Sequence, residues 1–347
     1  MKTFDYSTLN NLVITPEMTT KISQIGELRG QLAQLAPREA AVLDRLLEVA
    51  KIQSTDASNR IEGIFTSDTR LRQLVQHRIQ PHDRSEEEIS GYRDVLDLIH
   101  DQYAYMPIRA TTILALHKKL FAFTASTWGG QFKDRDNQIV TVFEDGTTET
   151  RFTPAPAIAT PQLMTDLCQG YEHALMEAKM PAVLLAGAFV FDFVSIHPFR
   201  DGNGRMSRLL TLLVLYRSGF EVGKYISIES LIEQTKTDYY RVLKESSDGW
   251  MANANTYTPF LNYFLSILLQ SYRDLVARVR PATTKTSAVA LIQTALEEAL
   301  KPLSKRELMG LIPTYSEVTI ARELNALLNE KKIVKVGQGR STKYRLV

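Results

Sequence analysis

The residues that could do chemistry are concentrated in one stretch in the middle of the chain, residues 195–208. It holds His197, Asp201, a Gly-Asn-Gly triplet and three arginines, and apolar sequence borders it on both sides. Charged side chains are rarely buried unless they are paired or used, so this composition is unusual for a core segment. We therefore expect an apolar helix, a tight polar loop and a second buried helix whose first turn faces a polyanion.

The triplet Gly202-Asn203-Gly204 at a helix start would expose unpaired backbone N–H groups beside the positive end of the helix dipole. Glycine permits the close approach and the unusual dihedral angles of an anion-binding nest suited to phosphate. Arg205 and Arg208 are three positions apart, so they point to one face of the following helix and could hold further phosphates. The pattern predicts a cradle for a triphosphate.

Two side chains beside this cradle supply the remaining chemistry. Asp201 offers a hard carboxylate oxygen, and magnesium usually enters a site through one or two carboxylates together with substrate phosphates. His197 ends the preceding helix at the same mouth and could act as a general base. These groups indicate nucleotidyl or phosphoryl transfer, with direct attack by a substrate group because the stretch contains no cysteine or lysine nucleophile.

Residues 197–208 resemble the Fic-domain signature, H-x-F-x-D/E-G-N-G-R-x-x-R, and match it at every specified position. The resemblance implies a mainly helical Fic core and, most often, transfer of AMP from ATP to a Tyr, Thr or Ser hydroxyl of a target protein. His197 would then deprotonate the hydroxyl that attacks the α-phosphate, and Asp201 would hold Mg²⁺ between the phosphates. Phe199 would be a buried anchor of the loop.

The same resemblance assigns phosphate contacts to the turn and the following helix. Asn203 and the backbone N–H groups of Gly202 and Gly204 would stabilise the charge that develops on the α-phosphate. Arg205 and Arg208 would bind the β- and γ-phosphates. Relatives in the family also transfer phosphate or phosphocholine, or remove AMP, so a de-AMPylase stays open as an alternative. The intact Arg208 favours ATP in the orientation for AMP transfer.

Two further segments fit the resemblance. Residues 139–143 and 149–152 flank an Asp-Gly turn and predict a β-hairpin. It lies where the family has a flap that pairs with target backbone; an ordinary surface hairpin is the alternative. Tyr239 and Tyr240 lie on a predicted helix that resembles the one lining the family's adenine pocket, and aromatic core packing remains the alternative for one of the pair.

Residues 58–63 match the family's inhibitory motif, [S/T]-x-x-x-E-[G/N], and precede the Fic core. Ser58 and Glu62 share one face of a helix, which Gly63 is expected to end. The resemblance implies that Glu62 pairs with Arg208, removes the partner of the γ-phosphate and puts a negative charge beside it. ATP would then bind only unproductively, and the enzyme would be autoinhibited.

The whole sequence is typical of a soluble protein with about two domains. Its 347 residues are 44% hydrophobic and 23% charged, and its single cysteine, Cys168, cannot form an intrachain disulfide. We expect a reducing, cytoplasmic setting. The chain start has no signal-peptide core, and the most apolar stretch, 182–196, is short for a bilayer span, so no membrane contact is expected. The six histidines show no zinc-like spacing, and magnesium is the only metal implied.

Helical periodicity dominates the chain. Thr15-Pro16-Glu17 predicts a helix start, with a capping residue followed by proline at the first helical position, and this apolar stripe ends near Pro37. A second helix is expected from about residue 38 toward the stop at Gly63. Further helices are expected at 68–77, 85–103, 110–121, 159–176, 182–194, 204–217, 237–246 and 259–280.

These elements divide the chain into an N-terminal helical region at 1–105, a Fic core at 106–280 and a C-terminal unit at 285–347. A polar, helix-breaking linker is expected at 281–285. In the C-terminal unit three helices precede two strands, which is the order of a winged helix-turn-helix. These elements are expected at 287–300, 304–311, 316–331, 333–336 and 343–347.

The C-terminal unit holds 11 Lys and Arg against 6 Glu, which permits contact with DNA phosphates. Glu317 and Glu323 lie on its third helix, however, and many winged helices contact proteins instead. A DNA-binding regulator whose Fic core senses nucleotide is therefore the second function to consider. By resemblance, self-modification and a homodimer are further expectations.

Overall fold

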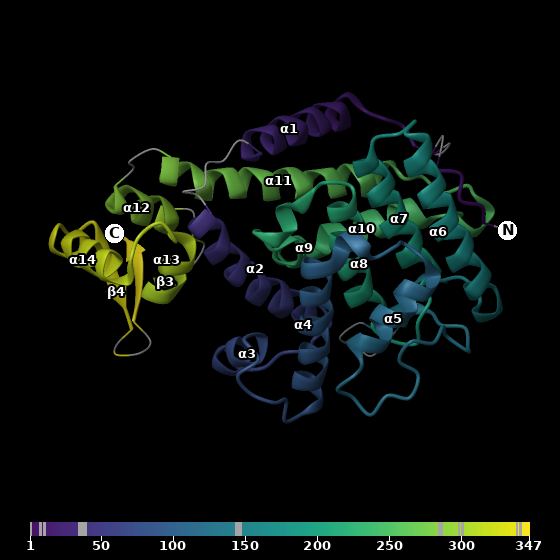
Figure 1. The fold of residues 1–347 in the computed structure, drawn as a ribbon, viewed down its shortest axis with the longest axis horizontal. Helices are drawn as coiled ribbons and strands as arrows, with labels where there is room; N and C mark the ends of the chain where they lie inside the picture. Colours follow the sequence, from purple (N-terminus) through teal and green to yellow (C-terminus); the bar gives the residue numbers. More distant parts are fainter. Residues whose placement is uncertain are drawn as a thin grey trace.

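The structure, a computed structural model, describes residues 2–6, 9, 12–33, 40–142, 148–283, 287–297, 299, 302–337, 339 and 342–347. Helices make up most of the fold (Figure 1). A large helical body holds the N-terminal and central parts of the chain, and a smaller C-terminal unit lies at one end of it (Figure 1). In the described part of the chain, no helix is both long and apolar enough to cross a bilayer.

Two N-terminal helices frame the body. The first, α1 (Pro16–Leu32), begins as predicted, because the Thr15 side chain accepts a hydrogen bond from the backbone N–H of Met18. It lies along the long helix α11 (Thr258–Thr283) at the edge of the body (Figure 1). The second, α2 (Ala40–Ile61), runs from the C-terminal unit into the centre of the body, where it contacts α4 (Arg84–Gln102) and α9 (Ile228–Gln234). It therefore carries residues 58–61 inward.

The centre of the body is the pair α7 (Ala182–Ile196) and α8 (Asn203–Arg217). Every residue of α7 except Ala182 and Val194 is buried, as expected for a helix that is apolar on all sides. Helices α6 (Thr160–Glu177) and α11 pack on α7, and α4 (Arg84–Gln102) packs on α8. The loop between α7 and α8 is thus held by a rigid frame.

The remaining elements of the body surround this pair. The short helix α9 was not predicted; it begins where the Ser227 hydroxyl accepts a hydrogen bond from the N–H of Ser230, a short-range cap that apolar periodicity alone does not reveal. The helices are α3 (Asp68–Val75), α5 (Ala110–Leu120), α9 (Ile228–Gln234) and α10 (Lys236–Ser247), with 3₁₀ turns at Tyr103–Tyr105, Ala157–Ala159, Glu221–Lys224 and Trp250–Ala252.

One charged residue lies inside apolar α7. Asp192 is fully buried, and its carboxylate accepts hydrogen bonds from three buried side chains, those of Tyr6 (2.5 Å), Trp250 (2.6 Å) and Tyr257 (2.8 Å). Burial of a carboxylate is tolerated when such bonds replace water. They tie the start of the chain and residues 250–257 to the helix that leads into the central loop.

A single hydrophobic cluster extends from Tyr6 to Val279. It takes residues from α1 and α2 as well as from α5 through α11. The predicted boundary at residue 105 therefore does not separate two cores, and the N-terminal helices pack as part of the same body as the central helices.

The predicted hairpin is present as β1 (Ile139–Val142) paired antiparallel with β2 (Thr148–Phe152). A register irregularity lies between Ile139 and Val140. The expected Asp145-Gly146 turn lies outside the described residues. Since β2 contacts α10, the hairpin extends from the body next to that helix.

The C-terminal unit has the predicted order of three helices and two strands, with one short strand in addition. Its sheet has the order β3-β5-β4, and all neighbours are antiparallel. It has its own apolar cluster, which includes Ile292, Leu308 and Ile320. The elements are α12 (Ala288–Glu297), β3 (Leu303–Ser304), α13 (Lys305–Leu311), α14 (Glu317–Asn329), β4 (Ile333–Val336) and β5 (Lys343–Leu346).

The junction before this unit differs from the expectation. Helix α11 continues through Pro281 to Thr283, so the first three residues of the predicted linker are helical. The unit also rests on the body, since α13 contacts α2 and the Arg45 guanidinium donates to the carbonyl of Pro313.

Candidate active site

The loop between α7 and α8 reverses the chain within six residues. His197 follows α7 in a left-handed conformation (φ 51°), and its N–H donates to the Phe193 carbonyl at 3.1 Å. Gly202 is also left-handed (φ 79°), and a Cβ there would lie 2.8 Å from the ring of Phe121. Glycine is therefore required at this position for both backbone and packing reasons.

Phe199 is the predicted anchor of the loop. Its ring is fully buried and stacks on the ring of His117, with 3.7 Å between centroids. Burial lowers the pKa of His117 to about 4, so the ring is neutral at pH 7. Nε2 of His117 then donates to the Asp201 carbonyl at 3.1 Å, and Nδ1 accepts from the Gly130 N–H at 2.9 Å. The loop is thus held from behind by α5.

A cavity of about 470 Å³ opens beside this loop. Its wall comes from the end of α2, the hairpin, the loop with the first turns of α8, and α10. It brings together most of the residues that the sequence singled out. Those in the wall are Glu62, His197, Asp201, Gly202, Asn203, Gly204, Arg208, Tyr239 and Tyr240.

His197 presents a neutral imidazole to this cavity. Burial, and then the nearby charge of Lys133, lower its pKa to about 4, whereas the Val194 backbone, Glu62 and Asp201 act in the opposite direction. At pH 7 the ring is therefore unprotonated and able to accept a proton.

Asp201 is the most solvated acidic group at the loop, with 46% of its side chain exposed. Oδ1 accepts the Gly202 N–H at 2.5 Å and lies 3.8 Å from the Arg205 guanidinium. Mg²⁺ is typically bound by one or two carboxylates, with phosphate and water oxygens completing its coordination. A single accessible carboxylate beside an anion-binding turn fits that donor set.

Arg208 makes three hydrogen bonds to the motif at the end of α2. Its Nη2 donates to Glu62 Oε1 at 2.7 Å and to the Ser58 carbonyl at 2.8 Å, and its Nε donates to the Ser58 hydroxyl at 2.7 Å. Arg208 is 2% exposed and Glu62 is 33% exposed. The predicted ion pair between residues 146 positions apart is therefore present.

Glu62 is held as a carboxylate in this position. Burial alone would raise its pKa, but the charge of Arg208 and its hydrogen bond hold the pKa below the usual value. The end of α2 is fixed by the left-handed Gly63 (φ 77°) and by Lys236, whose Nζ donates to the Ile61 carbonyl at 2.8 Å.

The same carboxylate lies against the start of α8. A Cβ on Gly204 would overlap Glu62 Oε1, and Gly204 is the second residue of that helix. The N-terminus of a helix attracts anions through its free N–H groups and its dipole. Glu62 therefore places its own carboxylate against the helix terminus that the sequence predicts as an anion site.

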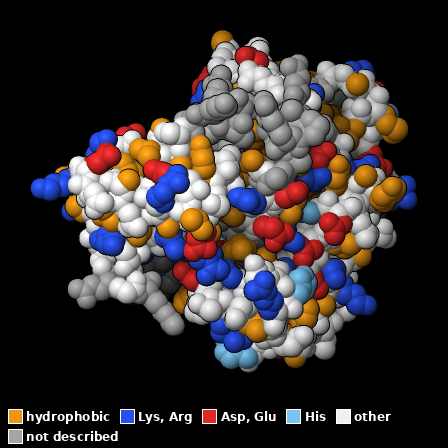
Figure 2. All heavy atoms as spheres, turned by 60° about the vertical axis from the view of Figure 1, so that its left-hand side comes forward, with side chains coloured by type: hydrophobic (Ala, Val, Ile, Leu, Met, Phe, Trp, Pro, Cys, Tyr) orange, Lys and Arg blue, Asp and Glu red, His pale blue; other side chains and the backbone are white. Residues whose placement is uncertain are grey.

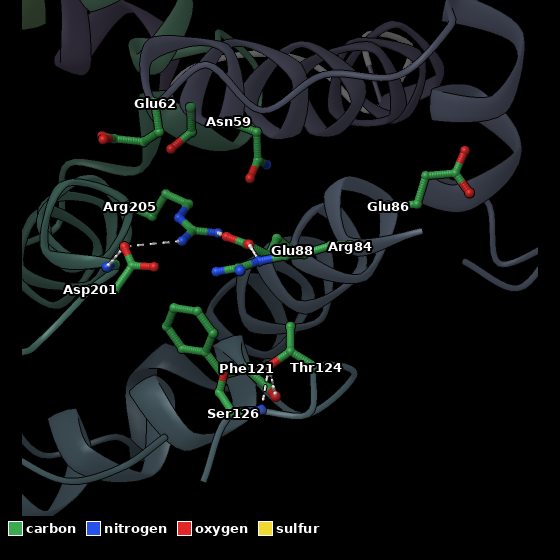
Figure 3. Close-up of polar contacts among 12 residues, drawn as sticks. Asn59, Glu62, Arg84, Glu86, Glu88, Phe121, Thr124, Ser126, Asp201 and Arg205 are labelled. Carbon is green, nitrogen blue, oxygen red and sulfur yellow. Dashed lines mark hydrogen bonds and ion pairs between the residues drawn. The ribbon is translucent and has the colours of Figure 1, made fainter. Parts of the chain in front are cut away.

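Arg205 does not face the cavity as predicted. It is 1% exposed, and its Nη1 lies 2.7 Å from Glu88 Oε2. Figure 3 shows its guanidinium between Asp201 and Glu88, with Arg84 bonded to the far side of Glu88 and Phe121 nearby. Residues three apart on a helix differ by about 60° around its axis, which is enough to turn Arg205 into the core while Arg208 stays at the cavity.

Removal of the Arg205 side chain is expected to lower stability strongly. An Arg205→Ala variant would remove the closest cation of buried Glu88 and leave only the exposed Arg84 paired with it, so the loss should approach but not exceed the roughly 3–5 kcal/mol of a fully unpaired buried charge. Urea unfolding followed by circular dichroism measures this loss. The matched control is Arg241→Ala, because Arg241 pairs with Asp238 and Glu245 on the exposed face of α10. Equal midpoints for the two variants would contradict a structural role for Arg205.

The Asn203 side chain is also used differently from the prediction. Its Oδ1 accepts the Phe199 N–H at 2.9 Å, and its Nδ2 donates to the Phe199 carbonyl at 2.8 Å. The carboxamide thus closes the loop, and only its second Nδ2 hydrogen is left for a ligand. The free N–H groups at the start of α8 remain the main anion donors.

The two predicted tyrosines lie on α10 and both reach the cavity. Tyr239 is 6% exposed and also packs near Phe260 and Tyr263, so it is part of the core as well. Tyr240 is half-buried. Its ring packs edge-on against that of Tyr239, with 5.4 Å between the ring centroids.

Sequence reasoning missed several residues at the site. Leu243, Lys244 and Ser247 follow Tyr240 at helical spacing and line the cavity, so the periodicity of α10 could have revealed them. Nothing in the sequence pointed to Glu88, His117 or Lys133, which act through tertiary contacts.

One acidic cluster lies apart from the cavity. His82, Asp83 and Glu86 place their ligand atoms close together. Both oxygens of Glu86, however, accept from Arg70, which lowers the pKa of Glu86 to about 2. These contacts are those of a structural ion pair.

The fold and the site define a mainly helical protein whose central helix–loop–helix presents a histidine and an anion-binding turn to one cavity. The sequence profile of the Fic/DOC family matches residues 107–215. The chain therefore carries a Fic domain, and the cavity is built around its signature loop.

Similar proteins agree with this assignment. A protein named "Protein adenylyltransferase Fic" from Drosophila mojavensis is 28% identical over 238 residues, which are 66% of this chain and 43% of that protein. A protein of the same name from Nematostella vectensis is 24% identical over 237 residues, 66% of this chain and 50% of that protein. The chain thus spans about half or less of the length of these relatives.

Solved structures share the fold. A Fic family protein from Desulfovibrio desulfuricans G20 aligns with a TM-score of 0.63 and 24% identity, over 96% of this chain and 97% of that chain. Fic-1 from C. elegans aligns with a TM-score of 0.60 and 18% identity, over 76% of this chain and 73% of that chain. The fold is therefore a mainly helical Fic fold.

Proposed function

We propose that the protein is an adenylyltransferase that moves AMP from ATP to a Tyr, Thr or Ser hydroxyl of target proteins. The observation that carries the proposal is the shared cavity, in which neutral His197 lies beside the N-terminus of α8 and the accessible carboxylate of Asp201. The names of the relatives support the same class of reaction.

In this mechanism the hydroxyl of the target is the nucleophile. His197 takes its proton, the oxygen attacks the α-phosphorus, and the bond to the bridging oxygen breaks so that pyrophosphate leaves. The N–H groups in the first turn of α8, that of Gly204 among them, stabilise the negative charge that develops on the α-phosphate, whereas the Gly202 N–H is already bonded to Asp201. Asp201 would hold Mg²⁺, which supplies charge neutralisation to the phosphates when it is bound.

Other residues of the cavity would bind the adenine, the terminal phosphates and the target protein. Tyr240 and Leu243 offer an aromatic and an apolar surface to adenine, and Arg208 is the cation for the terminal phosphates. Ile139 and Phe152 of the hairpin line the cavity at its other side, and an outer strand of a two-stranded sheet can pair with an extended target segment.

We also propose that Glu62 inhibits this reaction. Its carboxylate uses the same guanidinium and the same helix terminus that the phosphates need. ATP bound beside Glu62 would lose its γ-phosphate partner and meet a like charge, so its α-phosphate would not be aligned for attack.

The test compares two forms of labelled ATP. Incorporation of label into protein from ATP labelled in the α-phosphate, with none from ATP labelled in the γ-phosphate, is the expected result in the Glu62→Gly variant. Label on the Glu62→Gly protein itself, seen after gel separation, would show self-modification. Incorporation from the γ-phosphate would instead indicate a kinase, and no incorporation from either, with loss of AMP from a modified substrate, would indicate a de-AMPylase.

The alternative of a DNA-binding regulator finds little support in the C-terminal unit. On the face shown in Figure 2, which brings that side of the molecule forward, the described basic and acidic side chains are interspersed. Lys305 pairs with Glu317, Arg322 with Glu323 and Lys332 with Glu330. Such pairs reduce the positive field that phosphate binding needs.

A further inference from the structure

A buried lysine lies directly behind the catalytic loop. Lys133 precedes the hairpin and is 5% exposed. Its Nζ donates to the Ile196 carbonyl at 3.1 Å, and its backbone N–H donates to the Pro198 carbonyl at 2.8 Å. The lysine therefore bonds to the residue on each side of His197.

These bonds act where the backbone needs support. His197 has a left-handed conformation, which residues other than glycine adopt rarely. Ile196 ends α7, so its carbonyl has no partner within the helix, and a cation at a helix C-terminus is also favoured by the helix dipole. Lys133 satisfies that carbonyl and fixes the turn from which the imidazole projects.

The lysine is part of a small clamp. Asn137 accepts a second hydrogen bond from Lys133 Nζ at 2.8 Å, and its own Nδ2 donates to the Phe199 carbonyl at 3.4 Å. Nearby, the exposed Asp134 pairs with Arg200 at 2.8 Å. Residues 133–137 thus contact the loop from Ile196 to Arg200 along its length.

Among the described residues, no carboxylate is hydrogen-bonded to the Lys133 ammonium, so its charge acts on His197. The two side-chain hydrogen bonds from its Nζ go to a carbonyl and an amide oxygen. Burial lowers the pKa of Lys133 to about 8, and the negative charge of Asp136 acts in the opposite direction. The ammonium group is therefore still mainly charged at pH 7. The other charged side chains that act on His197 are Glu62, at the end of α2, and Asp201, in the loop.

We propose that Lys133 is a positioning residue for the general base: it fixes the backbone of His197 and keeps the imidazole in its proton-accepting form. The inference rests on the proposed function for its catalytic meaning, but the effect on His197 can be measured without any catalysis. Burial lowers the His197 pKa most, Lys133 is the charged group that adds to this effect, and the acidic neighbours Glu62 and Asp201 oppose it.

The first test follows the His197 ring directly. In protein labelled with ¹³C at the histidine rings, the signal absent from His197→Ala is assigned to His197 and followed from about pH 5 to 8. In Lys133→Met the signal should begin to move toward the shift of a protonated ring at a higher pH than in the full-length wild type, because burial still lowers the His197 pKa but the cation no longer adds to that effect. Lys133→Arg should restore the wild-type behaviour. An unchanged His197 signal in Lys133→Met would overturn the proposal.

A second variant separates the charge from the hydrogen bonds. Lys133→Gln keeps a side-chain donor but has no charge, and it should move the His197 titration as Lys133→Met does while unfolding closer to the wild-type temperature. If Lys133→Met does not fold, Lys133→Gln alone carries the test. A Lys133→Gln protein whose His197 signal follows the wild-type pH dependence would overturn the role of the charge.

The kinetic test uses the Glu62→Gly background. Lys133→Met should lower kcat for AMP transfer at least about tenfold with the KM for ATP unchanged, and the acid limb of the pH profile should move to higher pH. Without the positive charge of Lys133 the His197 pKa rises. On acidification the base is then protonated, and activity is lost, at a higher pH than in the parent variant. A lower kcat with an unmoved acid limb would mean a purely structural role and would overturn the proposal.

The proposed AMP transfer and the positioning role of Lys133 can fail separately. If no variant transfers AMP but the His197 titration responds to Lys133, the proposed function fails and the positioning role stands. If Glu62→Gly transfers AMP but neither the titration nor the acid limb responds to Lys133, the positioning role fails and the proposed function stands.

Discussion

Replacement of Glu62 by glycine is expected to raise the rate of AMP transfer by roughly 10- to 100-fold. The change removes one charge-assisted hydrogen bond to Arg208, a contact typically worth about 1.5–3 kcal/mol, and every 1.4 kcal/mol corresponds to about tenfold in population. It also clears the carboxylate that lies against Gly204 at the start of α8. Arg208 and the helix N-terminus then become available to the phosphates together.

The measurement is incorporation of α-labelled AMP, into the protein itself and into proteins of a lysate, at equal protein and ATP concentrations. The matched control is Glu330→Gly, because Glu330 also directly follows a helix, α14, and pairs with a lysine far from the cavity. That control should behave like the wild type. A Glu62→Gly protein with wild-type or lower incorporation would refute the inhibitory role.

The variant also has a structural readout that does not depend on the target. Since Ser58 still accepts two hydrogen bonds from Arg208, α2 should stay docked and the protein should unfold at nearly the same temperature. Affinity for the ATP analogue with a non-hydrolysable bond between the α- and β-phosphates should rise, because a like charge beside the γ-phosphate has been removed.

The contact between Glu62 and Arg208 shows how far the sequence could lead. The two positions are 146 residues apart, and the prediction came from two local motifs whose relation a family resemblance supplied. Periodicity placed Ser58 and Glu62 on one helix face, and the structure has both on the same guanidinium. The short-range features of the fold were accessible in the same way, as the cap at Thr15 illustrates.

The contacts that the sequence did not predict share a physical cause. Arg205 and Asn203 were predicted as phosphate ligands, and their side chains contact groups that no local pattern reveals: Glu88 on α4 and the backbone of Phe199. Which group a buried polar side chain contacts depends on tertiary packing. Pro281 is a similar case, because its local preference against a helix interior is overridden in α11.

Removal of the imidazole is the second change with a large expected effect. In the Glu62→Gly background, His197→Ala should lower AMP transfer by roughly 10²- to 10⁴-fold, the usual contribution of a positioned general base. ATP binding should be nearly unchanged, since the N–H groups at the start of α8, including that of Gly204, and the cation Arg208 are all retained. Isothermal titration with Mg²⁺ and ATP measures the affinity, and α-label incorporation measures the transfer.

The backbone at this position calls for a second variant. His197 is left-handed, a conformation that costs alanine more than asparagine, so His197→Ala could distort the loop as well as remove the base. His197→Asn keeps the left-handed turn and lacks a group that accepts a proton near neutral pH. The exposed His173, paired only loosely with Glu177, provides the control His173→Ala, which should transfer AMP at the parental rate.

The combination of the variants assigns the function of the imidazole. Loss of transfer in both His197→Ala and His197→Asn, with ATP affinity within about twofold of the parent, means that the base acts on the hydroxyl and not on nucleotide binding. Parental transfer by His197→Asn would eliminate His197 as the base, and the proton would then have to leave the hydroxyl by another route. A parallel loss of ATP affinity would instead assign His197 to shaping the phosphate site, because the same loop carries both the imidazole and the start of α8.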